Sequence, residues 1–391
     1  MLKSDQPGDI DLTEYESDAE AHPYIEQLDR LDPADAEKLL NVGVDPAETD
    51  RAGTFIVKDR SVIHCATRQP GVEMMGISQA RQAHPWLGEY IWRNVAPETD
   101  SYTALAKEKP QEGYFIRSLE GAKVDHPVQA CLYIAKERFS QNVHNLVIAE
   151  EDSDLHIITG CATAPHLVSG LHVGVSEFYV KRGARLTFTM IHEWGEDVRV
   201  RPRTVARVEE GGVLVSNYIS LRPVSSLQMF PVTRLVGRGA VARLNSVLVA
   251  ARGSHLDVGS RVILEAPDTR AEIISRGICA GGEIIARGEL IGKVAGVKAH
   301  LECKGLILQD GLMRAIPELS GHVPGVEMSH EAAVGKIDQQ EIEYLMARGL
   351  DEESAISTIV RGFLNVDIEG LPNRLKEKLD KAISETEKDM M

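Results

Sequence analysis

Residues 240–278 read AVARLNSVLVAARGSHLDVGSRVILEAPDTRAEIISRGI, and this stretch decides the fold class. Three runs rich in β-branched and other apolar residues, Ala240–Ala250, Ser260–Leu264 and Ala271–Ile278, are separated by short polar segments. Runs of this length and composition, bounded by turn residues, indicate β-strands. Apolar residues follow one another almost continuously within them, and two-residue hairpin signals such as Asn-Gly are rare. This pattern favours stacked parallel strands over a meander of tight hairpins.

The same texture extends on both sides of this stretch, from about Tyr114 onward. Further strands are expected at Leu146–Ala149, Leu155–Ile158, Phe178–Val180, Arg185–Ile191, Val198–Val208 and Val213–Leu221. Turn signals fall at Gly183, Gly211-Gly212, Gly237-Arg238-Gly239, Gly253, Gly281-Gly282 and Gly296. Many short strands at regular spacing are typical of a sandwich, a barrel or a solenoid. The parallel character of the strands leads us to predict a mainly β chain with a parallel β-helix core.

Negative charge is concentrated at the N-terminus. Residues 1–50 hold fifteen Asp and Glu against three Lys and Arg, a net charge of −12 out of −16 for the chain. We interpret residues 1–20 as an acidic, flexible lead-in, and an acidic surface argues against nucleic-acid binding. Residues 21–119 combine short helical patterns with loops, for example Pro33–Leu40 with Asp32 placed to cap that helix.

The period becomes helical after Asp338. Gly349 is placed to end a first helix and Asp351 to cap a second one. The apolar stripe of the second helix is formed by Ile356, Ile359, Val360 and Phe363. Such a stripe packs either on the protein's own core or on a partner. The expected organisation is a lead-in at 1–20, a mixed region at 21–119, the β-helix core at 120–330 and a helical subdomain at 331–391.

Several classes of protein are excluded by absent patterns. No apolar run approaches the roughly 20 residues of a membrane-spanning helix, and the N-terminus lacks a signal-peptide pattern, so we expect a cytoplasmic protein without a membrane partner. The five cysteines are dispersed without any C-x-x-C pair, which argues against a disulfide framework. No Walker A motif and no paired-carboxylate signature of a glycosidase is present, so we expect no enzymatic reaction from the chain itself.

Three residues near the end of the strand-rich region form a candidate metal site. Cys303, His330 and Glu331 supply a thiolate, an imidazole and a carboxylate, a set suited to iron or zinc. Oxygen and nitrogen ligands in place of some thiolates should weaken the retention of such a metal and ease its release. His330 and Glu331 are neighbours in the sequence, so on a strand they would point to opposite faces. In that case one would face the site and the other the core.

The chain resembles the SufB/SufD family of scaffold proteins of the SUF iron–sulfur cluster assembly machinery. The segments that carry the resemblance are Thr159–Pro165, Leu301–Leu308, Ala315–Leu319, Ser329–Asp338, Tyr344–Leu350 and Ile359–Leu364. The resemblance implies a right-handed parallel β-helix flanked by helical regions. It also implies a scaffold that holds a transient [4Fe-4S] or [2Fe-2S] cluster near a dimer interface, takes sulfur from a donor and passes the cluster to apo-proteins.

The resemblance also implies roles for individual residues. Cys303 falls on the essential cysteine position of SufB-type members, Glu331 on their carboxylate position and His330 on the histidine position of SufD-type members. With both sets of ligands in one chain, a homodimer is expected. Cys161 and Cys279 are both second-rank candidates for sulfur transfer, and Cys161 is the counterpart of the upstream cysteine that receives sulfur as a persulfide in SufB-type members.

A docking site for a SufC-like ATPase is implied on the helical hairpin, at Tyr344, Arg348, Gly349, Leu350, Ile359 and Phe363. The chain departs from the family in lacking the clustered N-terminal cysteines of SufB-type members and any signature for flavin. A structural SufD-like subunit without a cluster of its own is therefore the alternative.

Overall fold

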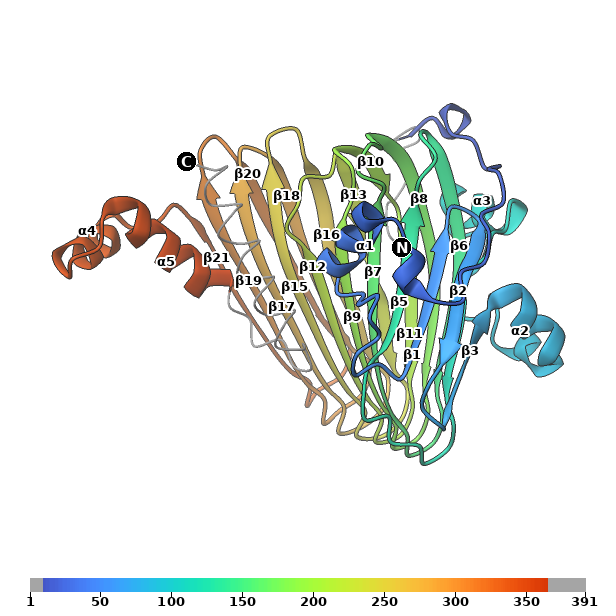
Figure 1. The fold of residues 1–391 in the computed structure, drawn as a ribbon. Helices are drawn as coiled ribbons and strands as arrows, with labels where there is room; N and C mark the ends of the chain where they lie inside the picture. Colours follow the sequence, from blue (N-terminus) through green and yellow to red (C-terminus); the bar gives the residue numbers. More distant parts are fainter. Residues whose placement is uncertain (1–9, 365–391) are drawn as a thin grey trace.

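The computed structural model describes residues 10–364 and shows two sheets of mainly parallel strands stacked face to face (Figure 1). The chain alternates between the sheets and forms a parallel β-solenoid of about eight turns. In spatial order the first sheet contains β2 (Ser61–Thr67), β1 (Gly53–Lys58), β5 (Val128–Ile134), β7 (Asp154–Thr163), β9 (Arg185–Glu193), β12 (Val213–Ser220), β15 (Val241–Ala251), β17 (Arg270–Ala280), β19 (Lys298–Leu308) and β21 (Glu327–Gly335). The predicted parallel β-helix is confirmed.

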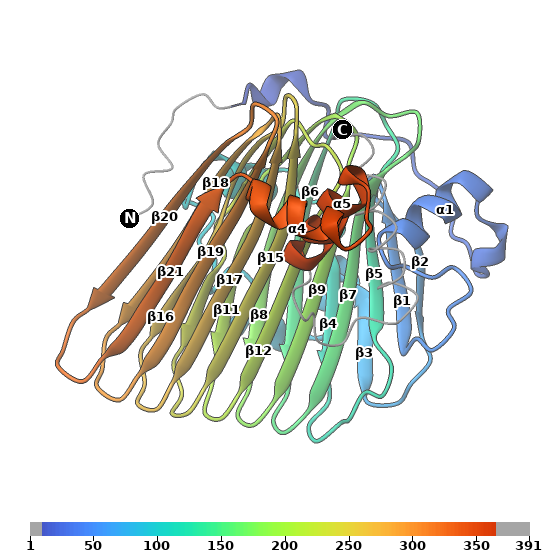
Figure 2. The same cartoon turned by 90° about the vertical axis from the view of Figure 1, so that its left-hand side faces the viewer.

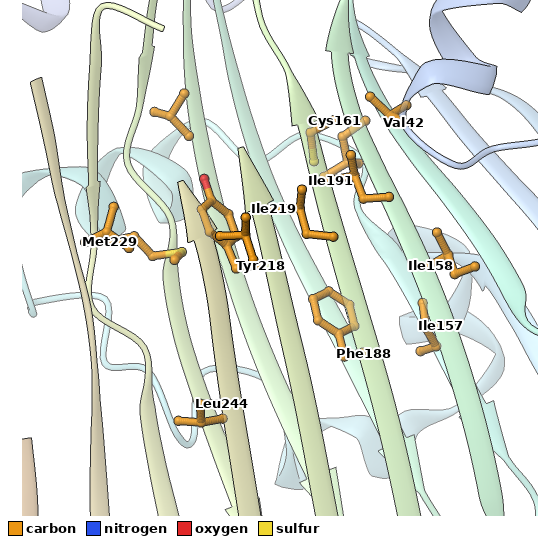
Figure 3. Packing of buried hydrophobic residues seen from close by; sticks show 14 of the residues in the cluster. Val42, Ile157, Ile158, Cys161, Phe188, Ile191, Tyr218, Ile219, Met229 and Leu244 are labelled. Carbon is orange, nitrogen blue, oxygen red and sulfur yellow. The ribbon is translucent and has the colours of Figure 1, made fainter. Parts of the chain in front are cut away.

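The second sheet faces the first sheet along the whole solenoid. It contains β10 (Asp197–Val200), β13 (Ser226–Met229), β16 (His255–Leu264), β14 (Val232–Leu235), β11 (Arg203–Val208), β8 (Ser169–Val180), β6 (Phe139–Ala149), β4 (Tyr114–Ser118) and β3 (Val72–Gly76), with β18 (Glu283–Gly292) beside β16 and β20 (Leu312–Gly321) beside β18. Side chains from the two facing surfaces fill one continuous apolar core. Figure 3 shows part of it, with Phe188, Tyr218 and Leu244 among the buried side chains.

Strand alternation explains how one sequence serves both the core and the surface. In β17, Ala271, Ile273 and Ser275 are buried between the sheets, while the residues between them face outward. The turns that pass the chain to the next strand need left-handed backbone, and Gly253 and Gly281 supply it with φ of +86° each. The glycine turn signals therefore mark real corners of the solenoid.

Two regions differ from the expected strand pattern. The run Val198–Val208 is not one strand, because it divides at Arg201–Pro202 into β10 and β11. Pro202 has no N–H to donate, and the buried Arg201 guanidinium donates instead to the carbonyl oxygens of Val200 and Ser226. Residues 21–119 also hold β1, β2 and β3, three strands that the helical patterns there did not indicate, and β1 pairs in parallel with β5.

The helices lie outside the sheets. They are η1 (Leu12–Glu14), η2 (Leu28–Arg30), α1 (Pro33–Asn41), α2 (Ile77–Ala83), η3 (Pro85–Glu89), α3 (Ser101–Glu108), α4 (Gln339–Ala347) and α5 (Glu352–Leu364). As predicted, Asp32 caps α1 by accepting from the Ala34 N–H at 2.9 Å. Within the described residues, none of these helices combines the length and hydrophobicity needed to cross a lipid bilayer.

The expected division into four segments remains a prediction. Of the acidic lead-in, residues 1–9 lie outside the described residues, whereas Glu16 forms a parallel bridge with Phe139 of β6. The solenoid strands continue to Gly335. The part of the C-terminal segment beyond residue 364 lies outside the described residues.

The two ends of the solenoid differ. At the N-terminal end, within the described residues, the antiparallel strands β2 and β3 are the edge strands and pair only with β1 and β4, and each keeps buried residues. At the other end, within residues 10–364, β21 pairs only with β19 and β20 only with β18. Alternate residues of β19 are buried, but almost every residue of β21 is exposed. Figure 1 shows α4 and α5 projecting beside this end, and Figure 2 places them in front of the first sheet. The C-terminal end is therefore an open pair of strand edges.

Candidate functional site at the open end of the solenoid

Cys303 lies in the middle of β19, one strand away from the open end. Its register neighbours are Ser275 on β17 and Ala332 on β21. The side chain points between the sheets and is fully buried. Burial raises the pKa of the Cys303 thiol to about 11, and Glu302 raises it further while the Arg276 guanidinium opposes the shift. The thiol is consequently neutral at physiological pH.

His330 and Glu331 lie on opposite faces of β21, as their adjacency predicts. His330 is in register with Leu301 and Glu331 with Glu302. Because Leu301 and Cys303 point between the sheets, His330 lies on the same inner side, two residues along the strand from the neighbour of Cys303. Glu331 lies on the outer face, where its side chain is 55% exposed. One chain therefore brings Cys303 and His330 to the same face and leaves Glu331 on the other.

An ion-pair ladder occupies the outer face behind Cys303. The Lys304 ammonium lies 2.9 Å from a carboxylate oxygen of Glu302 and 3.1 Å from one of Glu331. Arg276 pairs with Glu302 from the neighbouring strand β17. These contacts hold the pKa of the Glu302 carboxyl below its usual range despite its partial burial. We refer to Arg276, Glu302, Lys304 and Glu331 as the outer ladder.

Among residues 10–364, no three His, Cys, Asp or Glu side chains lie together in a way that could hold a metal ion. The three predicted ligands are thus not assembled in the single chain, and their role as ligands remains a prediction. A complete donor set would need Glu331 to move, a second chain to contribute, or both.

A column of polar and sulfur-bearing side chains runs inside the solenoid from Cys161 to Cys303. Cys161 of β7 is in register with His192 of β9, and the Tyr218 hydroxyl lies 2.7 Å from His192 Nδ1. The column then continues on the next three strands of the first sheet. Its remaining contacts are the register pair Tyr218–Ser246, the hydrogen bond between Ser246 and Ser275 at 3.0 Å, and the register pair Ser275–Cys303.

The space around this interior column is not completely filled. A cavity of about 50 Å³ lies between the sheets and is lined in part by Met190, Tyr218 and Ser246. A volume of this size exceeds the roughly 10–15 Å³ that a cavity needs to hold one water molecule. Because Tyr218 and Ser246 belong to the column, the cavity lies between Cys161 and Cys303, the two cysteines at its ends.

Two buried polar atoms near Cys161 have no partner. Among the described residues, neither Nε2 of His192 nor Nε1 of Trp194 makes a hydrogen bond, although both side chains are at most 5% exposed. Burial, with His172 nearby, holds the pKa of His192 well below its usual range, so the ring is neutral. His192 and Trp194 lie near Cys161 in the sequence but resemble ordinary β-core residues, and only strand register places His192 beside the thiol.

The two cysteines predicted to transfer sulfur differ in their relation to this column. Cys161 begins it and is fully buried, and burial raises the pKa of its thiol well above the usual range. Cys279 is also buried, with a pKa raised to about 11, and its thiol donates to the Leu312 carbonyl at 3.3 Å. It lies four residues beyond Ser275 on β17, roughly 13 Å along the strand. The structure thus connects Cys161, but not Cys279, to Cys303 through neighbouring side chains.

The helical hairpin of α4 and α5 has the predicted cap at Asp351 and a second cap at Asp338, which was not predicted from the sequence. Asp338 accepts from the Gln340 N–H at 2.9 Å and Asp351 from the Ser354 N–H at 2.7 Å. Gly349 links the helices with φ of +100°. The bend between the helices is therefore fixed by the residues that the sequence indicated.

The predicted docking residues fall into two groups. Tyr344 is 59% exposed, and Arg348 donates to its hydroxyl at 2.9 Å, while Leu350 is exposed beside them. Ile359 is half-buried, and the Phe363 ring lies 6.0 Å from the Arg276 guanidinium on β17. The apolar stripe of α5 packs on the solenoid, and the turn of the hairpin faces outward.

Comparison with known proteins gives consistent similarities. Residues 132–363 match the family model described as "SUF system FeS cluster assembly, SufBD core domain". The chain is 49% identical over 358 residues to an iron–sulfur cluster assembly SufBD family protein of Archaeoglobus fulgidus, covering 91% of this chain and 96% of that one. It is 48% identical to a protein of the same description from Methanothermobacter thermautotrophicus, over 94% and 91% of the two chains. Similarity to the iron–sulfur cluster assembly protein SufB of Bacillus subtilis is 32% over 300 residues, 75% of this chain and 64% of that protein.

Proposed function

Because the chain belongs to the SufBD family of iron–sulfur cluster assembly proteins, we propose that it is a scaffold on which a cluster is built and from which it is released. The cluster is cargo and not a resident cofactor. The chain itself catalyses no conventional reaction, and ATP hydrolysis is supplied by a SufC-like ATPase. Participation in iron–sulfur cluster assembly follows from family membership, and the role as the cluster-holding member is our proposal.

The observation that carries this proposal is the position of Cys303 and His330. Both lie on the inner side of the last two strands of the first sheet, at the C-terminal end of the solenoid, where β21 is exposed. A thiolate and an imidazole are suitable ligands for iron, and a mixed set of this kind holds a cluster less tightly than four thiolates do. Mössbauer spectroscopy of the reconstituted chain would distinguish a [4Fe-4S] from a [2Fe-2S] cluster.

A second copy of the chain is the natural complement to this end. Unpaired strand edges favour association with another strand, and a two-fold contact would bring two copies of Cys303, His330 and Glu331 together. Such a homodimer would supply more ligands than one chain can. We propose that the cluster forms at this interface.

The hairpin of α4 and α5 is the proposed attachment point of the ATPase. Its outer turn exposes Tyr344, Arg348 and Leu350, while α5 packs against β17, the strand next to β19. A force applied to the hairpin would therefore be transmitted to the strands that carry the cluster ligands. We propose that the complex operates in the cytoplasm and transfers its cluster to apo-proteins.

Sulfur delivery is the proposed role of the interior column. A donor persulfide would transfer its outer sulfur to the Cys161 thiolate and leave as a thiol, so that Cys161 would hold sulfur as a persulfide at the start of the column that ends at Cys303. If the Tyr218 hydroxyl donates to His192 Nδ1, Nε2 carries the proton. The N–H groups of His192 and Trp194 could then both stabilise a sulfur anion near Cys161. Cys161 is fully buried in the described structure, so loading requires an opening of the solenoid.

A structural SufD-like subunit is the second candidate. The burial of Cys303 and the raised pKa of its thiol favour it, because metal ligation requires an accessible thiolate. In that role the chain would stabilise the ATPase complex through the hairpin without holding a cluster.

Anaerobic reconstitution with iron and sulfide decides between the two. The full-length chain, alone and with its ATPase, is compared with Cys303→Ala, Glu331→Gln and His330→Ala by absorbance and Mössbauer spectroscopy. Cys65→Ala is the control, because this cysteine lies on β2 at the far end of the solenoid. A cluster that forms on the native chain and on Cys65→Ala, but not on Cys303→Ala, supports the scaffold. Equal iron uptake by all variants, with unchanged ATPase binding, supports the structural subunit.

A further inference from the structure

The outer ladder contains a contact that bears directly on how the cluster ligands assemble. Glu302 and Glu331 are register neighbours, so their carboxylates lie side by side on adjacent parallel strands. Two like charges in this arrangement repel each other, and a cation between them is needed to hold both in place. Lys304 is that cation, at 2.9 Å from Glu302 and 3.1 Å from Glu331.

Lys304 is also the cation that contacts the Glu331 carboxylate on the outer face. Cys303 and His330 are on the inner side of the same strands, and Glu331 is the one predicted ligand on the outer side. It lies on the edge strand β21, so its side chain can reach round the edge only after leaving Lys304. Among the described residues, no second cation lies within ion-pair distance of Glu331.

We infer that Lys304 is a positioning residue that keeps Glu331 on the outer face, and that release of this ion pair is a step in forming the metal site. The inference rests on the proposed function, since it takes Glu331 as a ligand. Lys304 competes with iron for the same carboxylate. Iron binding therefore replaces the ammonium as the partner of Glu331, while Glu302 retains Lys304 and Arg276 on the outer face.

The same strand pair provides a matched control. Lys298 and Glu327 are also register neighbours on β19 and β21, with an ion pair of 2.8 Å. Removal of the Lys298 ammonium changes the charge of the chain by the same amount as removal of the Lys304 ammonium and likewise breaks an ion pair between β19 and β21, although Lys298 pairs with one carboxylate and Lys304 with two. It does not touch a predicted ligand.

The test is titration of the full-length chain with Co²⁺, as an oxygen-stable probe for Fe²⁺, under reducing conditions. We expect Lys304→Met to lower the Kd for Co²⁺ by about two- to fivefold, the range that loss of one partly exposed ion pair implies. Lys298→Met should leave the Kd unchanged. The difference between wild type and Lys304→Met should shrink between low and high salt, because salt screens the competing ammonium. A purely structural role of Lys304 would change the melting temperature without this salt-dependent change in Kd.

Glu331→Gln separates failure of this inference from failure of the proposed function. In a chain that already carries Glu331→Gln, the Lys304→Met substitution should no longer change the Kd. If Glu331→Gln and Cys303→Ala both leave Co²⁺ binding unaltered, the proposed ligand set is wrong. If those two variants weaken binding while Lys304→Met has no effect or weakens it as well, the ligand set stands and the positioning role of Lys304 is overturned.

Discussion

At the scale of single residues, Glu177 is a densely bonded side chain outside the proposed site. It is fully buried, and its carboxylate accepts from the backbone N–H groups of residues 92–95 and lies 2.8 Å from Nε2 of His144. In Glu177→Gln the amide NH₂ would face these donors, which should cost about 3 kcal/mol in the free energy of opening this loop. Hydrogen exchange of the amides of residues 92–95 measures that energy. Glu210→Gln, at an exposed carboxylate, should leave their protection unchanged, and equal protection in both variants would contradict the assignment.

The Cys303 thiol leads to a prediction on pH. Its folded pKa of about 11 lies above the unfolded value of 9.0, so burial of the neutral thiol stabilises the native state fully below pH 9.0 and loses that contribution as pH rises toward 11. At pH 8 the thiolate population is about 100-fold smaller in the native chain than in the unfolded one. We expect alkylation of Cys303 by iodoacetamide, followed by peptide mass spectrometry, to be at least that much slower in the native chain. Equal rates in native and urea-unfolded protein would show that Cys303 is already open.

At the scale of elements, two glycines of the helical hairpin should respond oppositely to the same substitution. Gly349 joins α4 and α5 with φ of +100°, a conformation that alanine adopts at a cost of about 1–2 kcal/mol. Gly362 lies within α5, and no neighbouring atom comes within 4 Å of the point where a Cβ would lie, so alanine there should favour the helix by up to about 1 kcal/mol. Gly349→Ala should reduce, and Gly362→Ala increase, the hydrogen-exchange protection of residues 339–364. Affinity for the ATPase should fall only in Gly349→Ala, and equal affinity in both variants would argue against docking at the turn.

The elements also show what one sequence can and cannot indicate. Caps and apolar periodicity are local, so Asp32, Asp351 and Gly349 could be placed correctly from the residues around them. The stacking of Cys161, His192, Tyr218 and Ser275 could not, because it depends on the length of every turn between them. A one-residue change in register would move each of these side chains to the other face. Adjacency on a strand was enough to predict that His330 and Glu331 lie on opposite faces. It could not predict which of the two faces inward, because that depends on the register of β21.

At the scale of the whole molecule, the unequal ends of the solenoid predict self-association. The C-terminal end exposes the strand edges of β20 and β21 together with Leu312, Val323 and Val334, at 46%, 38% and 39% exposure. An open edge with apolar side chains favours pairing with a second edge, and a lysine there opposes it. We expect the chain to form a dimer at micromolar concentration and Val334→Lys to shift it toward monomer by about tenfold or more in Kd.

Light scattering after size-exclusion chromatography measures this equilibrium, and Val168→Lys is the control. Val168 is the more exposed of the two valines, at 55%, but it lies in the loop between β7 and β8, away from the last strands. If Val334→Lys dissociates the dimer and also abolishes cluster formation while Val168→Lys does neither, the cluster depends on the interface. If Val334→Lys yields a monomer that still assembles a cluster, one chain supplies all the ligands, and Glu331 must then reach the inner face of its own β21. A chain that is monomeric at all concentrations would remove the dimer interface and leave the open end to a different partner.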